Sequence, residues 1–216
     1  MSHMGQCLNF TMLQALGRMQ RRIIRNTRYF GIPCTKSPMD MWVYREIIFR
    51  QKPDFIIEIG CGRGSSSLAL AHTMDIVNHG EICAIDLSLK RFNREARNHS
   101  RIFPFEGEAC ELFETIQGTV AHNIFKKHPL SVMIIEDSSH TYENTINVLR
   151  TYSPLVTKDY YFIVEDTNGK FGIGNMTGAF EAVEDFIKEN DNFEIDHSQE
   201  SFFLTWNPSG YLRRIK

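Results

Sequence analysis

Three carboxylates follow two apolar runs that are typical of buried strands. Asp137 comes directly after the run 131–136, while Glu165 ends the run 160–165 and Asp166 follows it. Because the carboxyl ends of neighbouring parallel strands meet at one edge of a sheet, we expect these side chains to lie close together. Three carboxylates repel one another unless a cation neutralises them, and oxygen ligands suit magnesium or another hard divalent ion. The pattern favours a metal site, with helix capping by the same acids as the alternative.

His140 stands three residues past Asp137, at the start of the next expected helix, where it would face the same cavity. A neutral histidine near pH 7 is a natural acceptor for the proton of a hydroxyl whose acidity a metal has raised. We therefore predict catalytic roles for His140, as general base, and for Asp137, as a holder of the metal. A surface histidine without such a role is the alternative.

A glycine-rich turn follows an earlier apolar run, 55–59. Gly60, Gly62 and Gly64 would let the backbone approach a ligand, and the free N–H groups of the following helix favour a negative group. The dinucleotide fingerprint G-x-G-x-x-G fails here, because it needs a further glycine at position 65 or 67, where the chain has serine. The turn is therefore a poor match for the pyrophosphate of a nicotinamide cofactor.

Asp86 ends the next expected strand, 22 residues after Gly64. A carboxylate at that point can accept hydrogen bonds from both hydroxyl groups of a ribose. The turn itself has the form E-x-G-x-G-x-G from Glu58 onward, which resembles the first motif of S-adenosylmethionine-dependent methyltransferases. A tight turn beside a solvated aspartate is the alternative.

The elements that must hold these residues show two kinds of pattern. Short, continuous apolar runs are typical of parallel strands buried on both faces, and apolar residues at three- and four-residue steps are typical of helices. The runs lie at 55–59, 81–86, 131–136 and 160–165, with helices expected through 68–71, 142–155 and 180–187 and closing strands at 193–195 and 202–206. We predict an α/β fold with a doubly wound, mostly parallel, Rossmann-like sheet preceded by N-terminal helices.

The first fifty residues have helical character. Apolar residues recur at helical spacing between 8 and 50, with a break at 31–33 and a helix start at Ser37 and Pro38. An arginine stripe on the first helix is a solvated face, or else it binds an anionic substrate or a neighbouring subunit. We divide the chain into an N-terminal helical segment, 1–50, with an expression-tag remnant at 1–4, and a methyltransferase domain, 51–216.

The composition of the chain argues against several classes of binding partner and environment. The 216 residues suit one α/β domain, and the formal net charge of −2 gives no general reason to expect nucleic acid. No apolar stretch is long enough for membrane insertion. The five cysteines are widely spaced and form no C-x-x-C pair, which argues against a zinc site or a disulfide framework. We therefore expect a reduced, cytoplasmic protein.

Several short motifs carry a resemblance to a known family. They span nearly the whole chain in order: Lys36-Ser37-Pro38 with Asp40-x-Trp42, Ile57-Glu58-Ile59-Gly60, Ala84-Ile85-Asp86, Asp137-Ser138-Ser139-His140-Thr141, Tyr152-Ser153-Pro154-Leu155-Val156, and Asn207-Pro208-Ser209-Gly210-Tyr211-Leu212-Arg213-Arg214. On these residues the chain resembles the cephalosporin hydroxylase and rhamnosyl O-methyltransferase family, whose fold and motifs are those of S-adenosylmethionine-dependent methyltransferases.

The resemblance implies an O-methyltransferase that uses S-adenosylmethionine and Mg²⁺ or another hard divalent cation. It further implies a homo-oligomer that acts on a hydroxyl of a sugar or small molecule, as in carbohydrate or antibiotic biosynthesis. The metal ligands that it implies are Asp137, Glu165 and Asp166. The implied cofactor-binding residues are Glu58, Gly60, Gly62, Gly64, Ser65, Ser66, Asp86, Glu106, Gly107 and Glu108.

Two other functions stay open at this point. One is a nicotinamide-dependent oxidoreductase on a similar sheet, which the glycine spacing disfavours. The other is a non-catalytic cofactor-binding partner protein in a biosynthetic pathway, which the acids and His140 disfavour. The glycine-rich stretch 168–176 is expected to be a mobile lid over the acceptor, with an ordinary surface loop as the alternative.

Overall fold

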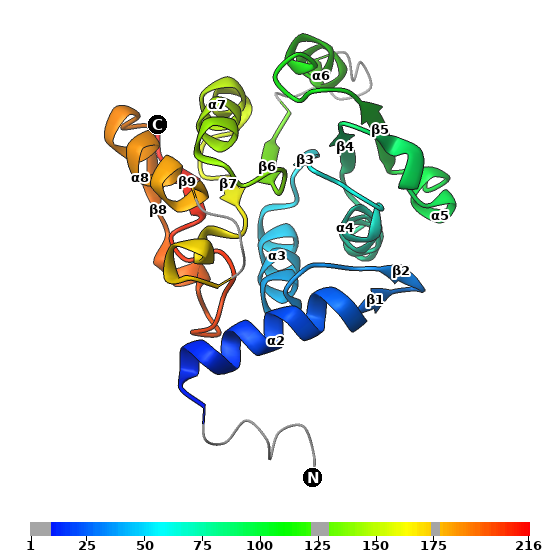
Figure 1. Ribbon diagram of the computed structural model, residues 1–216. Coiled ribbons are helices and arrows are strands. Elements are labelled where there is room, and N and C mark those ends of the chain that lie inside the picture. Colours follow the sequence, from blue (N-terminus) through cyan, green and yellow to red (C-terminus); the bar gives the residue numbers. More distant parts are fainter. Residues whose placement is uncertain (1–9, 122–129, 174–177) are drawn as a thin grey trace.

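A seven-stranded sheet runs through the centre of the protein (Figure 1). The computed structural model describes residues 10–121, 130–173 and 178–216. The strand order is β5-β4-β3-β6-β7-β9-β8, with β3 at Phe55–Ile59, β4 at Glu81–Asp86, β5 at Ile102–Glu106, β6 at Val132–Glu136, β7 at Tyr161–Val164, β8 at Phe193–Ile195 and β9 at Tyr211–Arg214. The strands from β5 to β7 pair in parallel, and β9 pairs antiparallel with both β7 and β8. This confirms the predicted mostly parallel, doubly wound sheet.

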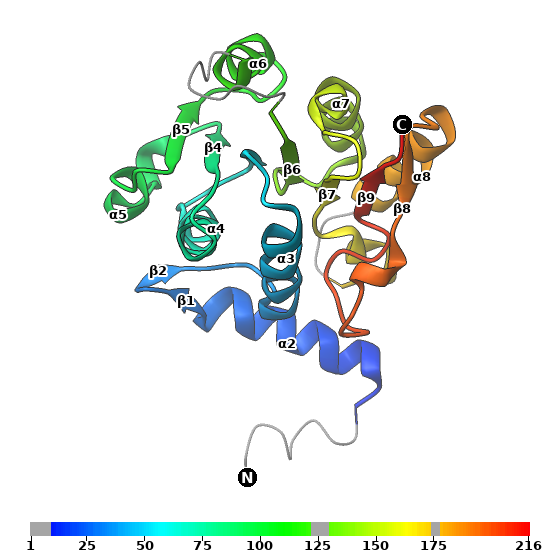
Figure 2. The same ribbon diagram turned by 180° about the vertical axis from the view of Figure 1, so that it is seen from behind.

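Helices cover both faces of the sheet, as Figures 1 and 2 show. One face carries α3 (Pro38–Gln51), α4 (Ser65–Ile76) and α5 (Arg94–Arg97), and the other carries α6 (Phe113–Ala121), α7 (Tyr142–Tyr152) and α8 (Ala179–Glu189). Short 3₁₀ helices are η1 (Leu89–Arg91), η2 (Ser153–Leu155), η3 (Thr167–Phe171) and η4 (His197–Gln199). The central strands β3 and β6 are buried throughout, because helices exclude water from both of their faces. An apolar core therefore lies on each side of the sheet.

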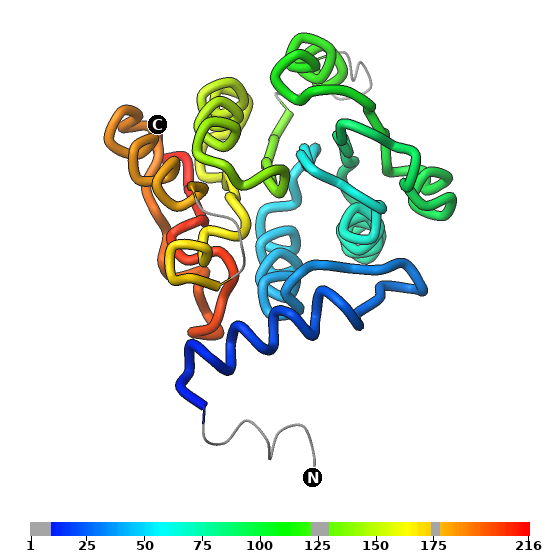
Figure 3. The backbone as a smooth tube through the Cα atoms, in the orientation of Figure 1, coloured from blue at the N-terminus to red at the C-terminus, as the bar shows by residue number. Residues whose placement is uncertain are grey.

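The N-terminal segment forms a helix, a hairpin and a second helix. α2 (Met12–Asn26) begins with a capping box at Thr11, and the hairpin of β1 (Arg28–Tyr29) and β2 (Ile32–Pro33) makes the predicted break. α3 then starts at the predicted place, with the Ser37 side chain accepting a hydrogen bond from the Asp40 N–H. Figure 3 shows this segment passing beside α4 and returning into α3. Residues 1–4, expected to be a tag remnant, lie outside the described residues.

The strand predicted at 202–206 is wrong. These residues form turns, because the Thr205 hydroxyl and the Trp206 N–H donate to the buried carboxylate of Asp40 instead of to a neighbouring strand. The closing strand is β9, a few residues later.

The sequence-based prediction also missed β5. Pro104 interrupts its pattern, and the strand forms the edge of the sheet, where a proline is tolerated.

Among the described residues, no helix combines the length and the apolar character that crossing a bilayer requires.

Candidate active site

The glycine turn packs directly against the end of β6. Gly60 has a φ of 91°, and a Cβ atom at this position would lie 2.0 Å from the carbonyl oxygen of Asp137. Gly64, with a φ of 78°, is the N-cap of α4, where a Cβ atom would lie 2.8 Å from Phe92 and Ala96. Glycine is the residue that tolerates such contacts at positive φ. The turn therefore brings the ends of β3 and β6 and the start of α4 together.

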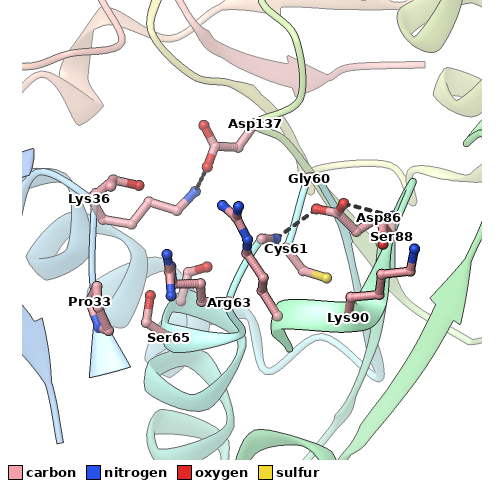
Figure 4. A pocket seen from close by; sticks show the side chains of 14 residues that line it. Pro33, Lys36, Gly60, Cys61, Arg63, Ser65, Asp86, Ser88, Lys90 and Asp137 are labelled. Carbon is pink, nitrogen blue, oxygen red and sulfur yellow. Dashed lines mark hydrogen bonds and ion pairs between the residues drawn. The ribbon is translucent and has the colours of Figure 1, made fainter. Parts of the chain in front are cut away.

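Asp86, at the tip of β4, holds this turn. Its Oδ2 accepts a hydrogen bond from the Gly62 N–H at 2.8 Å, and its Oδ1 accepts one from the Ser88 N–H at 3.1 Å. Each carboxylate oxygen can accept a further hydrogen bond, so Asp86 retains acceptor capacity for two hydroxyl groups. In Figure 4 its side chain lies at the wall of a cavity beside the turn.

Two adjoining cavities open at this edge of the sheet. The first has a volume of about 600 Å³, and its lining includes the basic residues Arg63, Lys90 and Arg91; Figure 4 shows the first two. The second, of about 530 Å³, passes the apolar side chains of Leu87 and Ala109 and reaches the acids at the ends of β6 and β7. The two cavities share Thr35, Gly60, Gly62, Asp86 and Asp137 as lining residues. Together they offer a polar compartment and a partly apolar one that meet at Asp86.

The implied cofactor residues divide between the cavity walls and the supporting turns. Those that line a cavity are Gly60, Gly62, Ser65, Ser66, Asp86, Gly107 and Glu108. Glu58 lines neither cavity; it is fully buried and accepts a short hydrogen bond from the Ser67 hydroxyl of α4. Glu106 likewise lines neither, and it accepts the Leu89 N–H at 3.0 Å. Both acids shape the turns around the cavities.

Asp137, His140 and Asp166 come together in the lining of the second cavity. His140 Nε2 lies 3.5 Å from Asp137 Oδ1 and 3.5 Å from Asp166 Oδ2. One potential ligand atom from each of the three residues lies within 4.8 Å of the others. His140 Nδ1 and Asp166 Oδ1 are buried and have no hydrogen-bond partner among the described residues. Such a group suits a hard cation, which would take up unsatisfied oxygen atoms.

Lys36, which was not predicted as a site residue, lies among the same acids. Its Nζ donates to Asp137 Oδ2 at 2.5 Å and to Glu165 Oε1 at 2.6 Å. Glu165 therefore faces Lys36, whereas Asp166 faces His140. The sequence offered one signal for Lys36, its place in the motif that precedes α3.

Burial and charge perturb the pKa of every group in this cluster. Burial raises the pKa of Asp137 and of Asp166 to about 6, although Lys36 opposes the shift at Asp137 and His140 opposes it at Asp166. Burial acts to lower the pKa of His140, but the carboxylates of Asp137 and Asp166 raise it above its ordinary value. The carboxylates of Asp137 and Glu165 raise the pKa of Lys36 despite its burial, so its amine stays charged. Shifts of this kind are typical of functional sites.

The stretch that was expected to form a lid is only partly a loop. Thr167, Asn168 and Gly169 are buried in η3, and Asn168 Nδ2 donates to Gln20 Oε1 of α2 at 3.3 Å. The first part of the stretch is thus packed against the N-terminal helix. Residues 174–177 lie outside the described residues.

The sheet order, the glycine turn after β3 and the acid at the tip of β4 together define the fold of an S-adenosylmethionine-dependent methyltransferase. The family model described as Rhamnosyl O-methyltransferase/CmcI matches residues 21–215, and the chain belongs to this family. It is an S-adenosylmethionine-dependent O-methyltransferase, as the sequence predicts. The nicotinamide-dependent and non-catalytic alternatives are thereby set aside.

Similar proteins include two curated relatives that the chain matches over most of their length. The rhamnosyl O-methyltransferase of Mycobacterium leprae (strain TN) is 29% identical over 199 residues, which cover 87% of this chain and 83% of the relative. The rhamnosyl O-methyltransferase of Mycobacterium bovis (strain BCG) is 29% identical over 198 residues, covering 87% and 78%.

Solved structures share the fold at lower sequence identity. A CmcI structure described with magnesium and S-adenosylmethionine has a TM-score of 0.67 at 20% identity, covering 91% of this chain and 84% of that one. The O-methyltransferase from Bacillus cereus, in complex with S-adenosylhomocysteine, has a TM-score of 0.56 at 15% identity, covering 89% and 86%.

Proposed function

We propose that this O-methyltransferase modifies a hydroxyl group of a sugar or related small molecule, with a divalent cation held beside the cofactor. One observation carries the proposal. Asp137, His140 and Asp166 line the same cavity as Asp86 and the glycine turn, so a cation and a nucleoside would be neighbours. The two mycobacterial relatives are named as rhamnosyl O-methyltransferases, which supports a sugar as the acceptor.

The two cavities would divide the cofactor between them. Asp86 is placed to accept hydrogen bonds from the ribose hydroxyls, and Leu87 and Ala109 offer apolar surface to the adenine base. Ser65 and Ser66, at the N-terminus of α4, line the first cavity, where free N–H groups favour the carboxylate of the methionine part. Gly60 and Gly62 belong to both cavities and would lie beneath the middle of the cofactor.

Asp137 and Asp166 would hold the cation, and His140 would take the proton of the acceptor hydroxyl. The donor set fits Mg²⁺, because it consists of carboxylate oxygens, of which Asp166 Oδ1 is buried and has no partner among the described residues. When bound, the cation would supply positive charge that makes a nearby hydroxyl more acidic. His140 must be neutral to accept a proton. A bound cation would neutralise the carboxylates of Asp137 and Asp166, whose negative charges raise the pKa of His140, and it would therefore favour the neutral imidazole. Alignment of the acceptor against the methyl group is the remaining contribution of the site.

The Asp137→Ala variant tests this function. We expect methyl transfer from labelled S-adenosylmethionine to candidate rhamnosides to fall by at least about a hundredfold and to lose its dependence on Mg²⁺, because the electrostatic contribution of the metal is lost. Binding of S-adenosylhomocysteine should change little, since the glycine turn and Asp86 remain. The Asp191→Ala variant, at a side chain that is 84% exposed, is the control. Undiminished turnover in Asp137→Ala would rule out the metal role.

A further inference from the structure

Three cationic side chains line the first cavity without an acidic partner. Arg63 belongs to the turn before α4, and Lys90 and Arg91 belong to η1, which follows β4. Figure 4 shows the first two, which come from separate elements and line the same cavity. None of the three forms an ion pair within the part of the chain that the structure describes. Their charges are therefore available to an anionic ligand, to which such donors form strong hydrogen bonds.

The other polar groups of this cavity already have a role in the proposed function. Asp86 accepts the Gly62 N–H and is placed for the ribose, and Asp137 belongs to the acidic group that suits a cation. Ser65 and Ser66, at the N-terminus of α4, are placed for the carboxylate of the cofactor. S-adenosylmethionine brings that one carboxylate together with a positive ammonium and a positive sulfonium group. The cofactor therefore provides no anion for the three cationic side chains.

The N-terminal helix adds positive charge at the same edge of the sheet. No acidic residue precedes Asp40, although the whole chain has a formal net charge of −2. α2 contributes Ile24 to the second cavity. Five exposed arginines lie on this helix or directly after it: Arg18, Arg21, Arg22, Arg25 and Arg28. Charge of one sign around a crevice attracts ligands of the opposite sign and speeds their association. The segment therefore favours an anionic acceptor over a neutral one.

We propose that the acceptor is a sugar or related small molecule with a phosphate or carboxylate group, which Arg63, Lys90 and Arg91 bind. The inference rests on the proposed function. Thr35 and Asp137 line both cavities, so one acceptor can extend from the second cavity into the first. Its hydroxyl group lies beside His140, and its anionic group lies among the three cations. The planar guanidinium of arginine matches the oxygen atoms of either anion.

Binding of inorganic phosphate tests the anion site without any methyl transfer. The protein is first saturated with S-adenosylhomocysteine, whose carboxylate fills the N-terminus of α4, and divalent cations are removed. We expect calorimetric titration to show phosphate binding that weakens at least about tenfold when Arg63→Gln and Lys90→Gln are combined, because two charged donors are lost. Arg94→Gln with Lys158→Gln removes the same charges at exposed side chains that line neither cavity, and it should bind phosphate as the wild type does.

Two results of that titration would overturn the inference. One is equal phosphate binding by the wild type and the cavity variant. The other is phosphate binding that disappears once S-adenosylhomocysteine is bound, since the cations would then serve the carboxylate of the cofactor.

Matched acceptors distinguish the two sources of the anion. Initial rates with labelled cofactor compare a sugar phosphate, a uronic acid and a neutral sugar. We expect one acidic acceptor to have a kcat/KM at least about tenfold above that of the neutral sugar, with the difference in KM, because its charge contributes to binding. The cavity variant should lose this preference, and the better acid identifies the group. Equal kcat/KM for acidic and neutral acceptors would overturn the inference.

These measurements separate the inference from the proposed function. Undiminished turnover in Asp137→Ala would remove the metal role, while phosphate binding at Arg63 and Lys90 would still stand. If neutral sugars are methylated in a reaction that depends on Asp137, and phosphate does not bind, only the anionic acceptor is lost.

Discussion

His140 is held in a backbone conformation that residues other than glycine rarely adopt. Its φ is 55°, its side chain is nearly buried, and its Nε2 faces two carboxylates. A left-handed conformation costs about 1–2 kcal/mol for such a residue. Strain of this kind persists where the surrounding structure fixes it, and it concentrates at functional sites. The orientation of this one ring is therefore a property that the fold maintains at a cost in stability.

Replacing His140 with alanine should lower kcat by about 10²- to 10⁴-fold, the contribution typical of a positioned general base. The Mn²⁺ dissociation constant should change by less than about threefold, because both carboxylate ligands remain. Initial rates with labelled cofactor and a Mn²⁺ titration check the two expectations. His197→Ala is the matched control, since that side chain is 67% exposed. A large loss of Mn²⁺ affinity would identify His140 as a ligand instead.

Cation binding should weaken as the pH falls through about 6. Burial raises the pKa of Asp137 and Asp166 to about 6, so below this value protons compete with the cation for both carboxylates. Affinity should fall by up to about a hundredfold per pH unit once both acids take up protons. Mn²⁺ titrations from pH 5 to pH 8 measure the profile. An affinity that stays constant down to pH 5 would mean that the ligands keep ordinary carboxylate pKa values of about 4.

At the residue scale, the sequence indicated the acids but not their pairing. Asp137 and Asp166 follow their strands as the apolar runs predict, and the parallel sheet brings them together. Glu165 and Asp166 are adjacent in the sequence, and no pattern shows that one faces α3 and the other the cavity. The contact of Lys36 with Glu165 spans 129 positions, so only the folded chain shows it.

At the element scale, the turn after β3 determines how closely two strand ends can approach. Gly60→Ala would place a Cβ atom 2.0 Å from the Asp137 carbonyl oxygen, so the turn or the end of β6 must move. We expect the free energy of unfolding to fall by more than about 2 kcal/mol, and binding of S-adenosylhomocysteine to weaken with it. Urea denaturation and calorimetric titration measure the two effects.

Gly62→Ala is the matched control for that variant. Gly62 also has a positive φ, 53°, but nothing lies within 4 Å of a Cβ atom placed there. The Gly62→Ala substitution should lower the free energy of unfolding only by its backbone strain, about 1–2 kcal/mol. Equal destabilisation by the two substitutions would contradict the close approach of the turn to β6.

The strongest sequence patterns gave the elements most accurately. β3, β4 and β8 have the predicted bounds, because central strands are continuous apolar runs and β8 is a short apolar run of its own. Elements at the edges were harder to predict. β5 contains a proline, and the apolar stretch 202–206 satisfies its polar groups on the side chain of Asp40. A local pattern does not show that a carboxylate distant in the sequence will accept the hydrogen bonds that a neighbouring strand would otherwise accept.

At the scale of the whole molecule, α3 contacts the segment that leads into β9 through one buried carboxylate. Asp40 of α3 accepts hydrogen bonds from the Thr205 hydroxyl, the Trp206 N–H and the Tyr211 hydroxyl. All of these groups are buried, so one carboxylate fixes the segment that leads into β9. The C-terminal motif is in this way attached to α3.

Asn207 extends this connection to the acidic group. Its Nδ2 donates to the Tyr44 hydroxyl at 2.8 Å, and its Oδ1 accepts the Asp166 N–H at 3.2 Å. Through this hydrogen bond, the C-terminal motif stabilises the backbone conformation of Asp166.

The homo-oligomer that the resemblance implies stays a prediction, which sedimentation of the purified protein would check.

The central claim is that the cofactor and the cation occupy adjoining parts of one crevice. The most direct test is the effect of Mn²⁺ on the NMR signals of bound S-adenosylhomocysteine. We predict strong paramagnetic broadening of the ribose and methionine protons in the wild-type protein, and its loss in the Asp166→Asn variant. Signals of the bound cofactor that stay sharp while Mn²⁺ saturates the wild-type protein would mean that the two sites do not adjoin.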